Sequence, residues 1–126
     1  MQLQNIEPQL IQLGYQIIAI SPDRPIKLAQ TIRKHKLNYL LLSDSKMKAA
    51  RAFGIAFKVA EETFKRNKNF DRALEDASGE KHHLLPVPAA YIVGTDGIIK
   101  FEYINPNYTA RIKPDLLLAA AKAALA

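Results

Sequence analysis

The segment LLPVPAAYIVGTDGIIKF, at residues 84–101, constrains the fold of this chain more than any other stretch. Two apolar runs flank Asp96-Gly97, and Asp-Gly between apolar strands is a strong signal for a tight β-hairpin turn. Pro86 and Pro88 stand directly before the first run. Because proline donates no backbone hydrogen bond, it is confined to the edges, starts and bulges of strands. The segment therefore predicts an antiparallel hairpin with a proline at its threshold.

The rest of the chain alternates between helical stripes and short apolar runs. Strands are predicted at 16–21, 37–42, 89–93 and 98–104. Helices are predicted at 2–13, after each of the first two strands, and at 115–125, with a polar helical insertion at 57–78. Strands separated by a helix pair in parallel, whereas the hairpin is antiparallel. The expected fold is a single α/β domain over residues 1–126, with a mixed sheet flanked by helices.

The charge of the chain is basic, with 18 Lys+Arg against 12 Asp+Glu and a formal net charge of +6. Such an excess suits acidic partners, nucleic acid included. The basic residues are spread over predicted helix exteriors and lack the interleaved aromatic residues of a platform for single-stranded nucleic acid. We therefore expect a solvated surface and no nucleic-acid partner. The alternative, a basic nucleic-acid binder, predicts salt-dependent retention on DNA.

The chain has no cysteine. This excludes disulfides, thiolate metal sites and thiol chemistry by these residues. The N-terminal residues lack the charged start and apolar core of a signal peptide, and the C-terminal LLLAAAKAALA is far shorter than the roughly 20 residues of a membrane span. The expected location is the cytoplasm, without a membrane partner.

Polar side chains offer few candidates for a catalytic or metal site. The adjacent His82 and His83 lack a nearby third ligand, so a polar loop is favoured over a metal centre. The acid pair Glu75-Asp76 lies on a polar helix and is expected to be solvated. Four serines lie in no nucleophile-elbow sequence, namely Ser21, Ser43, Ser45 and Ser78. We expect no metal and no cofactor.

The bond between Val87 and Pro88 is the remaining candidate feature. A trans bond would make Pro88 the plain start of an edge strand. A cis bond, which is essentially a proline phenomenon, would mark a tight turn and turn the backbone of the preceding residue outward, where it could pair with an extended ligand. The residues alone leave both alternatives open.

Three stretches in register resemble the AhpC/TSA (redoxin) group of peroxiredoxin-like proteins: QLGYQIIAISPDRPIKL, LNYLLLSD and LPVPAAYIVGTDGIIKFEYINPNYTAR. The resemblance covers essentially the whole chain and implies a thioredoxin-like fold with thiol-dependent reduction of peroxides or disulfides. It also implies that Val87-Pro88 is the cis-proline of that fold and one wall of the active site. Tyr108 and Arg111 belong to an Asn-Pro-x-Tyr-x-x-Arg-like segment of the family, and no role is carried onto them.

The chain departs from this family at the reactive cysteine. Family members carry that cysteine just before the helix that corresponds here to residues 2–13. We therefore expect an N-terminally truncated, incomplete thioredoxin-like fold that lacks the first strands and the cysteine loop. No residue of the chain is expected to be catalytic, and an inactive oxidoreductase domain is the leading interpretation. Whether the chain is an enzyme stays open.

The alternative interpretation is a non-enzymatic thioredoxin-fold module that binds a peptide or a partner subunit. Loss of a central strand would expose backbone edges on the apolar strands at 16–21 and 89–93, and exposed edges invite pairing with another chain. A homodimer through these edges is therefore expected. A thioredoxin-type reductant is expected only for a full-length form that contains cysteine.

Overall fold

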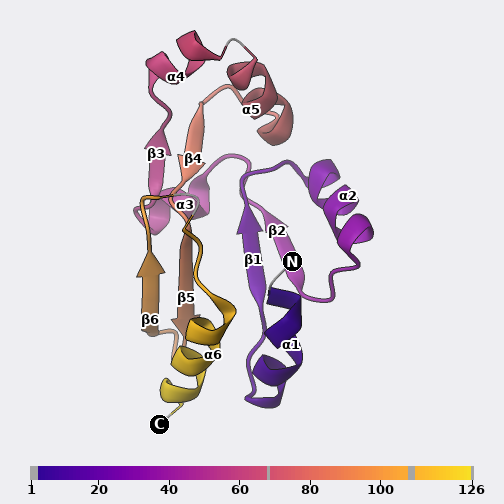
Figure 1. Cartoon of the computed structure of the whole chain (residues 1–126), viewed down its shortest axis with the longest axis vertical. Helices are drawn as coiled ribbons and strands as arrows, with labels where there is room; N and C mark the ends of the chain where they lie inside the picture. Colours follow the sequence, from indigo (N-terminus) through magenta and orange to yellow (C-terminus); the bar gives the residue numbers. More distant parts are fainter. Residues whose placement is uncertain (1–2, 68, 108–109, 126) are drawn as a thin grey trace. The chain divides into compact units, whose positions relative to one another are not determined.

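The computed structural model of the chain describes residues 3–67, 69–107 and 110–125. In order along the chain, the elements are α1 (Leu3–Gln12), β1 (Ile18–Ser21), α2 (Pro25–His35), β2 (Leu40–Ser43), α3 (Lys48–Ala52), β3 (Ala56–Lys58), α4 (Glu61–Arg66), α5 (Phe70–Ser78), β4 (Leu84–Pro86), β5 (Ala89–Val93), β6 (Ile99–Ile104) and α6 (Pro114–Ala123). Figure 1 shows these elements. The combination of helices and strands confirms the predicted α/β class. The predicted mixed sheet is not found among the described residues, whose strands pair as three two-stranded sheets, β1-β2, β3-β4 and β5-β6.

The chain divides into two compact units, which are described separately. The first unit joins Met1–Ile17 to Val87–Ala126, and the second is Ile18–Pro86. The prediction of one domain stays a prediction. No helix among the described residues is both long enough and apolar enough to cross a membrane.

The first unit packs α1 and α6 against the hairpin of β5 and β6 (Figure 1). Its buried cluster consists of Ile6 and Leu10 from α1, Ile92 from β5 and Ala121 from α6. Ile6 and Leu10 are four residues apart and therefore share one helix face. The Tyr15 hydroxyl donates to the carbonyl of Ala121 at 2.8 Å, which ties the chain after α1 to α6.

The hairpin of β5 and β6 is antiparallel, as the sequence predicts. Ala90 pairs with Tyr103 and Ile92 with Phe101, and the register shifts between Ile92 and Val93. The turn works as Asp-Gly chemistry requires, since Gly97 has φ +81° and the Asp96 carboxylate accepts from the backbone N–H of Ile98 at 3.1 Å. The same carboxylate pairs with Lys100 at 3.1 Å. These contacts hold the pKa of Asp96 below its ordinary value.

The second unit begins with a parallel pair, β1 and β2, in which Ile18 lies opposite Leu40 and Ile20 opposite Leu42. The predicted second strand at 37–42 is displaced toward the C-terminus in the structure. The physical reason is the end of α2, where Lys36 adopts a left-handed conformation and Leu37 donates its N–H to the carbonyl of Ile32. Leu37 and Tyr39 are buried in the connection rather than in a strand.

The predicted helical insertion at 57–78 is only partly helical. We call residues 56–86 the arm. It contains β3 and β4 as an antiparallel pair, with Ala56 opposite Pro86 and Lys58 opposite Leu84, and with α4 and α5 between the two strands (Figure 1). The sequence does not predict β3 and β4, because strands of three residues carry no measurable periodicity. Pro86 occupies a strand end, the position open to proline.

Candidate functional site

The carboxyl ends of β1 and β2 lie in two of the stretches that resemble the family, at Ser21-Pro22-Asp23 and at Ser43-Asp44. Side chains at this edge of a parallel sheet lie close together, which is why ligands often bind there. The backbone N–H of Asp44 donates to the carbonyl of Ser21 at 2.7 Å. The Ser43 hydroxyl donates to the carbonyl of Asp23 at 2.7 Å, and Ser21 Oγ accepts from the N–H of Asp23 at 3.1 Å. The two motifs, Ser-Pro-Asp and Ser-Asp, therefore form one hydrogen-bonded junction.

Asp44 organises the chain that follows β2. Its two carboxylate oxygens accept from the N–H groups of Ala49 and Ala50, at 3.0 and 2.9 Å. These N–H groups lie in the first turn of α3 and have no partner inside the helix. Asp44 thus caps α3 from outside the helix, since α3 begins only at Lys48 and the side chain reaches across five and six residues.

Asp23 lies in a partly buried environment that its sequence neighbours do not predict. Burial raises the pKa of the Asp23 carboxyl, and the charge of Lys27 opposes that rise. Among the carboxyl groups of the described residues whose shift is resolved, this is the one with a raised pKa. Such a group favours proton uptake more than an ordinary aspartate. No periodicity or motif signal distinguishes Asp23 from a plain helix-capping residue.

The two histidines serve structural contacts. The N–H of Leu84 donates to Nδ1 of His82 at 3.0 Å, so this nitrogen carries the lone pair. Nε2 of His82 lies 2.7 Å from the carbonyl oxygen of Ser45 and therefore carries the proton. His83 Nε2 lies 3.0 Å from Glu75, and its ring lies 4.5 Å from that of Phe64. Within the described residues, no group of three potential metal ligands occurs.

Val87 and Pro88 are half-buried and connect β4 to β5. The prediction of a cis bond between them is wrong, because the described residues contain no cis peptide bond. The trans isomer is intrinsically favoured at proline, and here Pro88 leads directly into β5 while its carbonyl accepts from the N–H of Asn105 at 3.1 Å. The role of Val87 and Pro88 as an active-site wall stays a prediction.

The loop after β6 is built around the hydroxyl of Tyr103. This hydroxyl donates to the carbonyl of Ala110 at 3.2 Å and accepts from Nδ2 of Asn105 at 3.3 Å. Asn105 Oδ1 also accepts from the N–H of Asn107 at 3.0 Å. The predicted motif residue Arg111 follows this loop and is exposed. The second predicted motif residue, Tyr108, lies outside the described residues.

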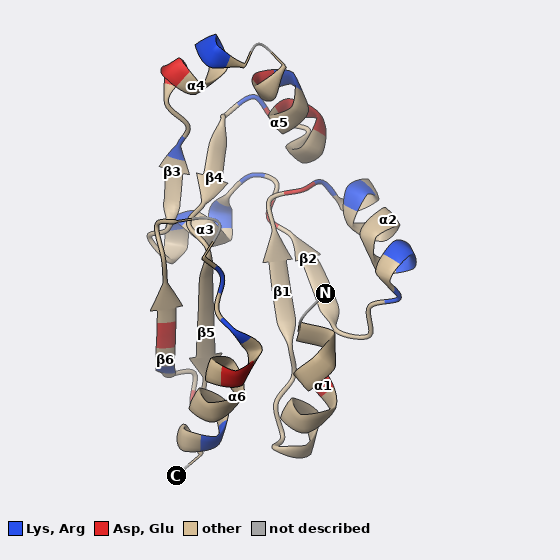
Figure 2. Ribbon diagram, in the orientation of Figure 1, with Lys and Arg blue, Asp and Glu red and all other residues tan. Residues whose placement is uncertain are grey.

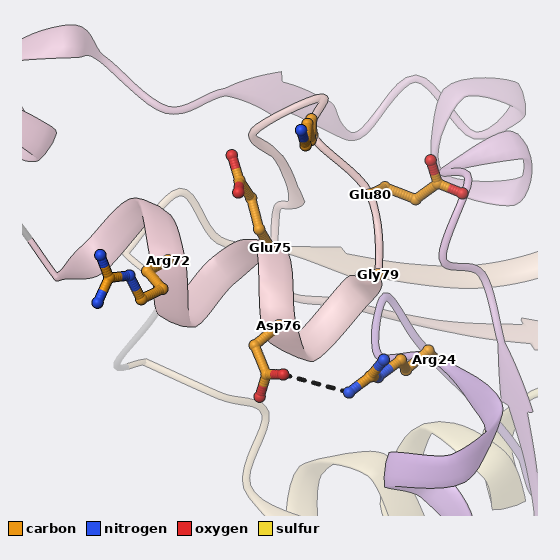
Figure 3. A pocket seen from close by; sticks show the side chains of 7 residues that line it. Arg24, Arg72, Glu75, Asp76, Gly79 and Glu80 are labelled. Atoms are coloured by element: carbon orange, nitrogen blue, oxygen red, sulfur yellow. Dashed lines mark hydrogen bonds and ion pairs between the residues drawn. The ribbon is translucent and has the colours of Figure 1, made fainter.

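An open pocket of about 350 Å³ lies where α5 meets the N-terminus of α2, within the second unit (Figure 3). Its charged lining consists of Arg24, Arg72, Lys81, Glu75, Asp76 and Glu80. Because the two signs are equally represented, the pocket has no strong preference for an anion or a cation. Its one internal ion pair joins Arg24 Nη2 to Asp76 Oδ1 at 3.2 Å.

The arrangement offers no activated nucleophile among the described residues. His82 contacts the carbonyl of Ser45 rather than its hydroxyl, and the Ser21 and Ser43 hydroxyls contact backbone groups. A serine nucleophile needs an adjacent base within hydrogen-bond reach. These hydroxyls therefore stabilise the junction of β1 and β2, and no described residue pairs them with a base.

Comparisons with known proteins supply the family. The model of the AhpC/TSA family matches residues 1–102. A protein named putative peroxiredoxin bcp, from Haemophilus influenzae, is 45% identical over 53 residues, which is 42% of this chain and 34% of that protein. The aligned part is thus about one third of the relative's length. The family match covers well over half of the chain, and the α/β architecture agrees with an incomplete thioredoxin-like fold. The chain belongs to the AhpC/TSA family.

Proposed function

We propose that this chain is the scaffold of a peroxiredoxin-like, thiol-dependent antioxidant oxidoreductase, and that residues 1–126 supply no nucleophile of their own. The observation that carries the proposal is the AhpC/TSA family match over residues 1–102 in a sequence without cysteine. Peroxide reduction of this kind forms a sulfur–oxygen bond as the O–O bond breaks, and the leaving oxygen takes up a proton. Only a thiolate sulfur can then be returned to its starting state by a second thiol.

In such a reaction, the residues of this chain would hold the active-site backbone in place and take up or release protons. The junction of Ser21, Asp23, Ser43 and Asp44 holds the ends of β1 and β2 in one geometry. Burial raises the pKa of the Asp23 carboxyl at this junction, which makes it a candidate for proton uptake if the reacting group binds beside it. A thioredoxin-type reductant has a role only where a cysteine is supplied by a longer form of the chain.

The test is peroxide consumption by the purified chain in the presence of thioredoxin, thioredoxin reductase and NADPH. We expect a rate equal to that of the protein-free blank, because the chain contains no thiol that the reductant could regenerate. A cysteine-containing peroxiredoxin serves as the positive control for the coupled assay. Clear turnover by the chain would contradict the proposal, since it would require a nucleophile other than sulfur.

A second candidate function, a non-enzymatic module that pairs with its own copy, is favoured by the surface of β1 and β2. Residues paired across the two strands point to the same side of the sheet. Ile18, Ile20, Leu40 and Leu42 therefore share one face, and all four are 43–52% exposed. Among the described residues, β1 pairs with β2 alone, so its other edge has free backbone groups. Apolar side chains beside an open edge favour self-association.

Sedimentation of the chain over a range of concentrations tests this module. We expect a concentration-dependent dimer that Ile20→Lys abolishes, because the lysine places a charge at the centre of the paired face. Ile11→Lys is the matched control, since Ile11 is 61% exposed on α1 and lies outside this face. A monomer at every concentration would overturn the module, and equal loss of dimer in both variants would place the interface elsewhere.

A further inference from the structure

The tip of the arm is held together by its own side chains. The ring centroids of Phe64 and Phe70 lie 5.7 Å apart, and that of His83 lies 4.5 Å from Phe64. Glu75 on α5 adds the contact to His83 Nε2 at 3.0 Å. This small cluster joins α4, α5 and the start of β4 without help from α2, so the tip can keep its internal packing whether or not it touches α2.

A separate set of contacts fastens the C-terminal end of α5 to the N-terminus of α2. The two oxygens of Asp76 each contact one cation, with Arg24 Nη2 at 3.2 Å from Oδ1 and Lys27 Nζ at 3.1 Å from Oδ2. The backbone N–H of Arg24 donates to the carbonyl of Ala77 at 2.8 Å. Figure 3 shows Arg24 reaching Asp76 at this end of α5.

The close approach of the Arg24 side chain to the end of α5 depends on the missing side chain of Gly79. A Cβ atom at this position would lie 3.3 Å from Cδ of Arg24, tighter than most real contacts. Gly79 also has φ +74° and closes α5 by donating its N–H to the carbonyl of Glu75. The stem of Arg24 thus passes over the glycine that ends α5. The prediction that Asp76 is solvated agrees with its exposed side chain, and the fold adds two partners, Arg24 and Lys27, from 52 and 49 residues away in sequence.

The ion pairs are open to solvent. The side chains of Asp76, Arg24 and Lys27 are 61%, 40% and 33% exposed. Exposed pairs are weak individually and are screened by salt. The two cations lower the pKa of Asp76, with the hydrogen bond from Lys27 as the largest cause, so the carboxylate is ionised at neutral pH. A contact of this strength can open without unfolding the elements that it joins.

We propose that Asp76 is a releasable latch that fastens the arm to α2, so that the second unit alternates between a latched state and a released state. Release breaks the Arg24–Asp76 and Lys27–Asp76 pairs and frees the N–H of Arg24 from Ala77. That N–H belongs to the residue directly after Ser21-Pro22-Asp23, so release frees the backbone that follows the junction at the end of β1. Figure 2 shows that both α2 and α5 carry charged residues, with basic ones on α2 and acidic ones on α5. This inference concerns regulation of the fold and does not depend on peroxide chemistry.

Amide hydrogen exchange of the whole chain, followed residue by residue, tests the latch. Asp76→Asn removes one charge with little change of shape. We expect it to speed exchange of the Arg24 amide by roughly three- to ten-fold, the loss typical of weak exposed ion pairs. Amides in the β1–β2 ladder should keep their protection. Raising salt from about 0.01 M to about 1 M, which shortens the Debye length from about 30 Å to about 3 Å, should move the wild type toward the variant.

Two further variants keep the test decisive. Glu62→Gln is the matched control, because Glu62 is an exposed carboxylate of α4 without an ion pair to any described residue, and it should exchange as the wild type does. Lys27→Gln removes one of the two pairs and should give an intermediate rate, even if Asp76→Asn folds poorly. Unchanged Arg24 exchange in Asp76→Asn would overturn the latch. Equal acceleration in the β1–β2 ladder would overturn it too, because that would mean global rather than local opening.

Discussion

Replacing Met47 with alanine should lower the free energy of unfolding by about 2–4 kcal/mol, the range for truncating a large buried side chain to alanine. Met47 is 0% exposed and, among the described residues, has the largest side chain that is completely buried. Truncation removes its transfer free energy and leaves a cavity that the surroundings refill only in part. Urea unfolding followed by circular dichroism measures the loss.

The backbone at Met47 makes this substitution easy to interpret. Met47 precedes α3 with φ +62°, a left-handed conformation that is strained for any residue with a Cβ atom. Alanine keeps the Cβ and hence the strain, so the measured loss reports packing. Met47→Leu, which nearly conserves volume, should cost less than about 1.5 kcal/mol. A loss in Met47→Ala no larger than that in Met47→Leu would contradict a packing role.

The second large effect is expected at Asp44. Asp44→Ala should lower the free energy of unfolding by about 2–3 kcal/mol, because hydrogen bonds to charged groups are worth about 1.5–3 kcal/mol and helix caps about 0.5–2 kcal/mol. The variant leaves the N–H groups of Ala49 and Ala50 without their acceptor, and Ala50 is only 5% exposed. An orphan donor near the interior costs more than one in water.

Asp44→Asn provides the matched control for this prediction. The asparagine retains one side-chain oxygen, so it can satisfy one of the two N–H groups and should recover about half of the loss. The same urea titration, run on both variants and the wild type, compares them directly. Equal stability of Asp44→Ala and the wild type would show that the two N–H groups find other acceptors and that the cap is dispensable.

Local patterns predicted the elements whose periodicity is long and whose turns have specific chemistry. The stripe through Ile6 and Leu10 predicted α1, and both residues are in the core of the first unit. Asp96-Gly97 predicted the hairpin, because the turn depends on a left-handed glycine and on a carboxylate that binds the nearby backbone. These features depend on residues a few positions apart.

Sequence patterns did not predict the short elements or the contacts between residues far apart in the chain. The strands β3 and β4 are three residues each and are defined by their pairing with one another. The contact from the N–H of Asn105 to the carbonyl of Pro88 joins residues 17 positions apart, which the dipeptide does not encode. The candidate-site role of Asp23 arises from burial in the folded chain. Resemblance to the family could not supply any of these three, because each depends on neighbours brought together by folding.

The sequence by itself determined the α/β class, the hairpin, the family and the absence of a thiol, since composition, periodicity and motif order are properties of the chain alone. Only the tertiary structure decided that Asp76 is held by Arg24 and Lys27, that Ser43 and Asp44 lock onto the end of β1, and that Met47 is enclosed. The physical reason is distance along the chain. Hydrogen bonds, ion pairs and burial between residues tens of positions apart exist only after the backbone has brought them together, and no local pattern records them.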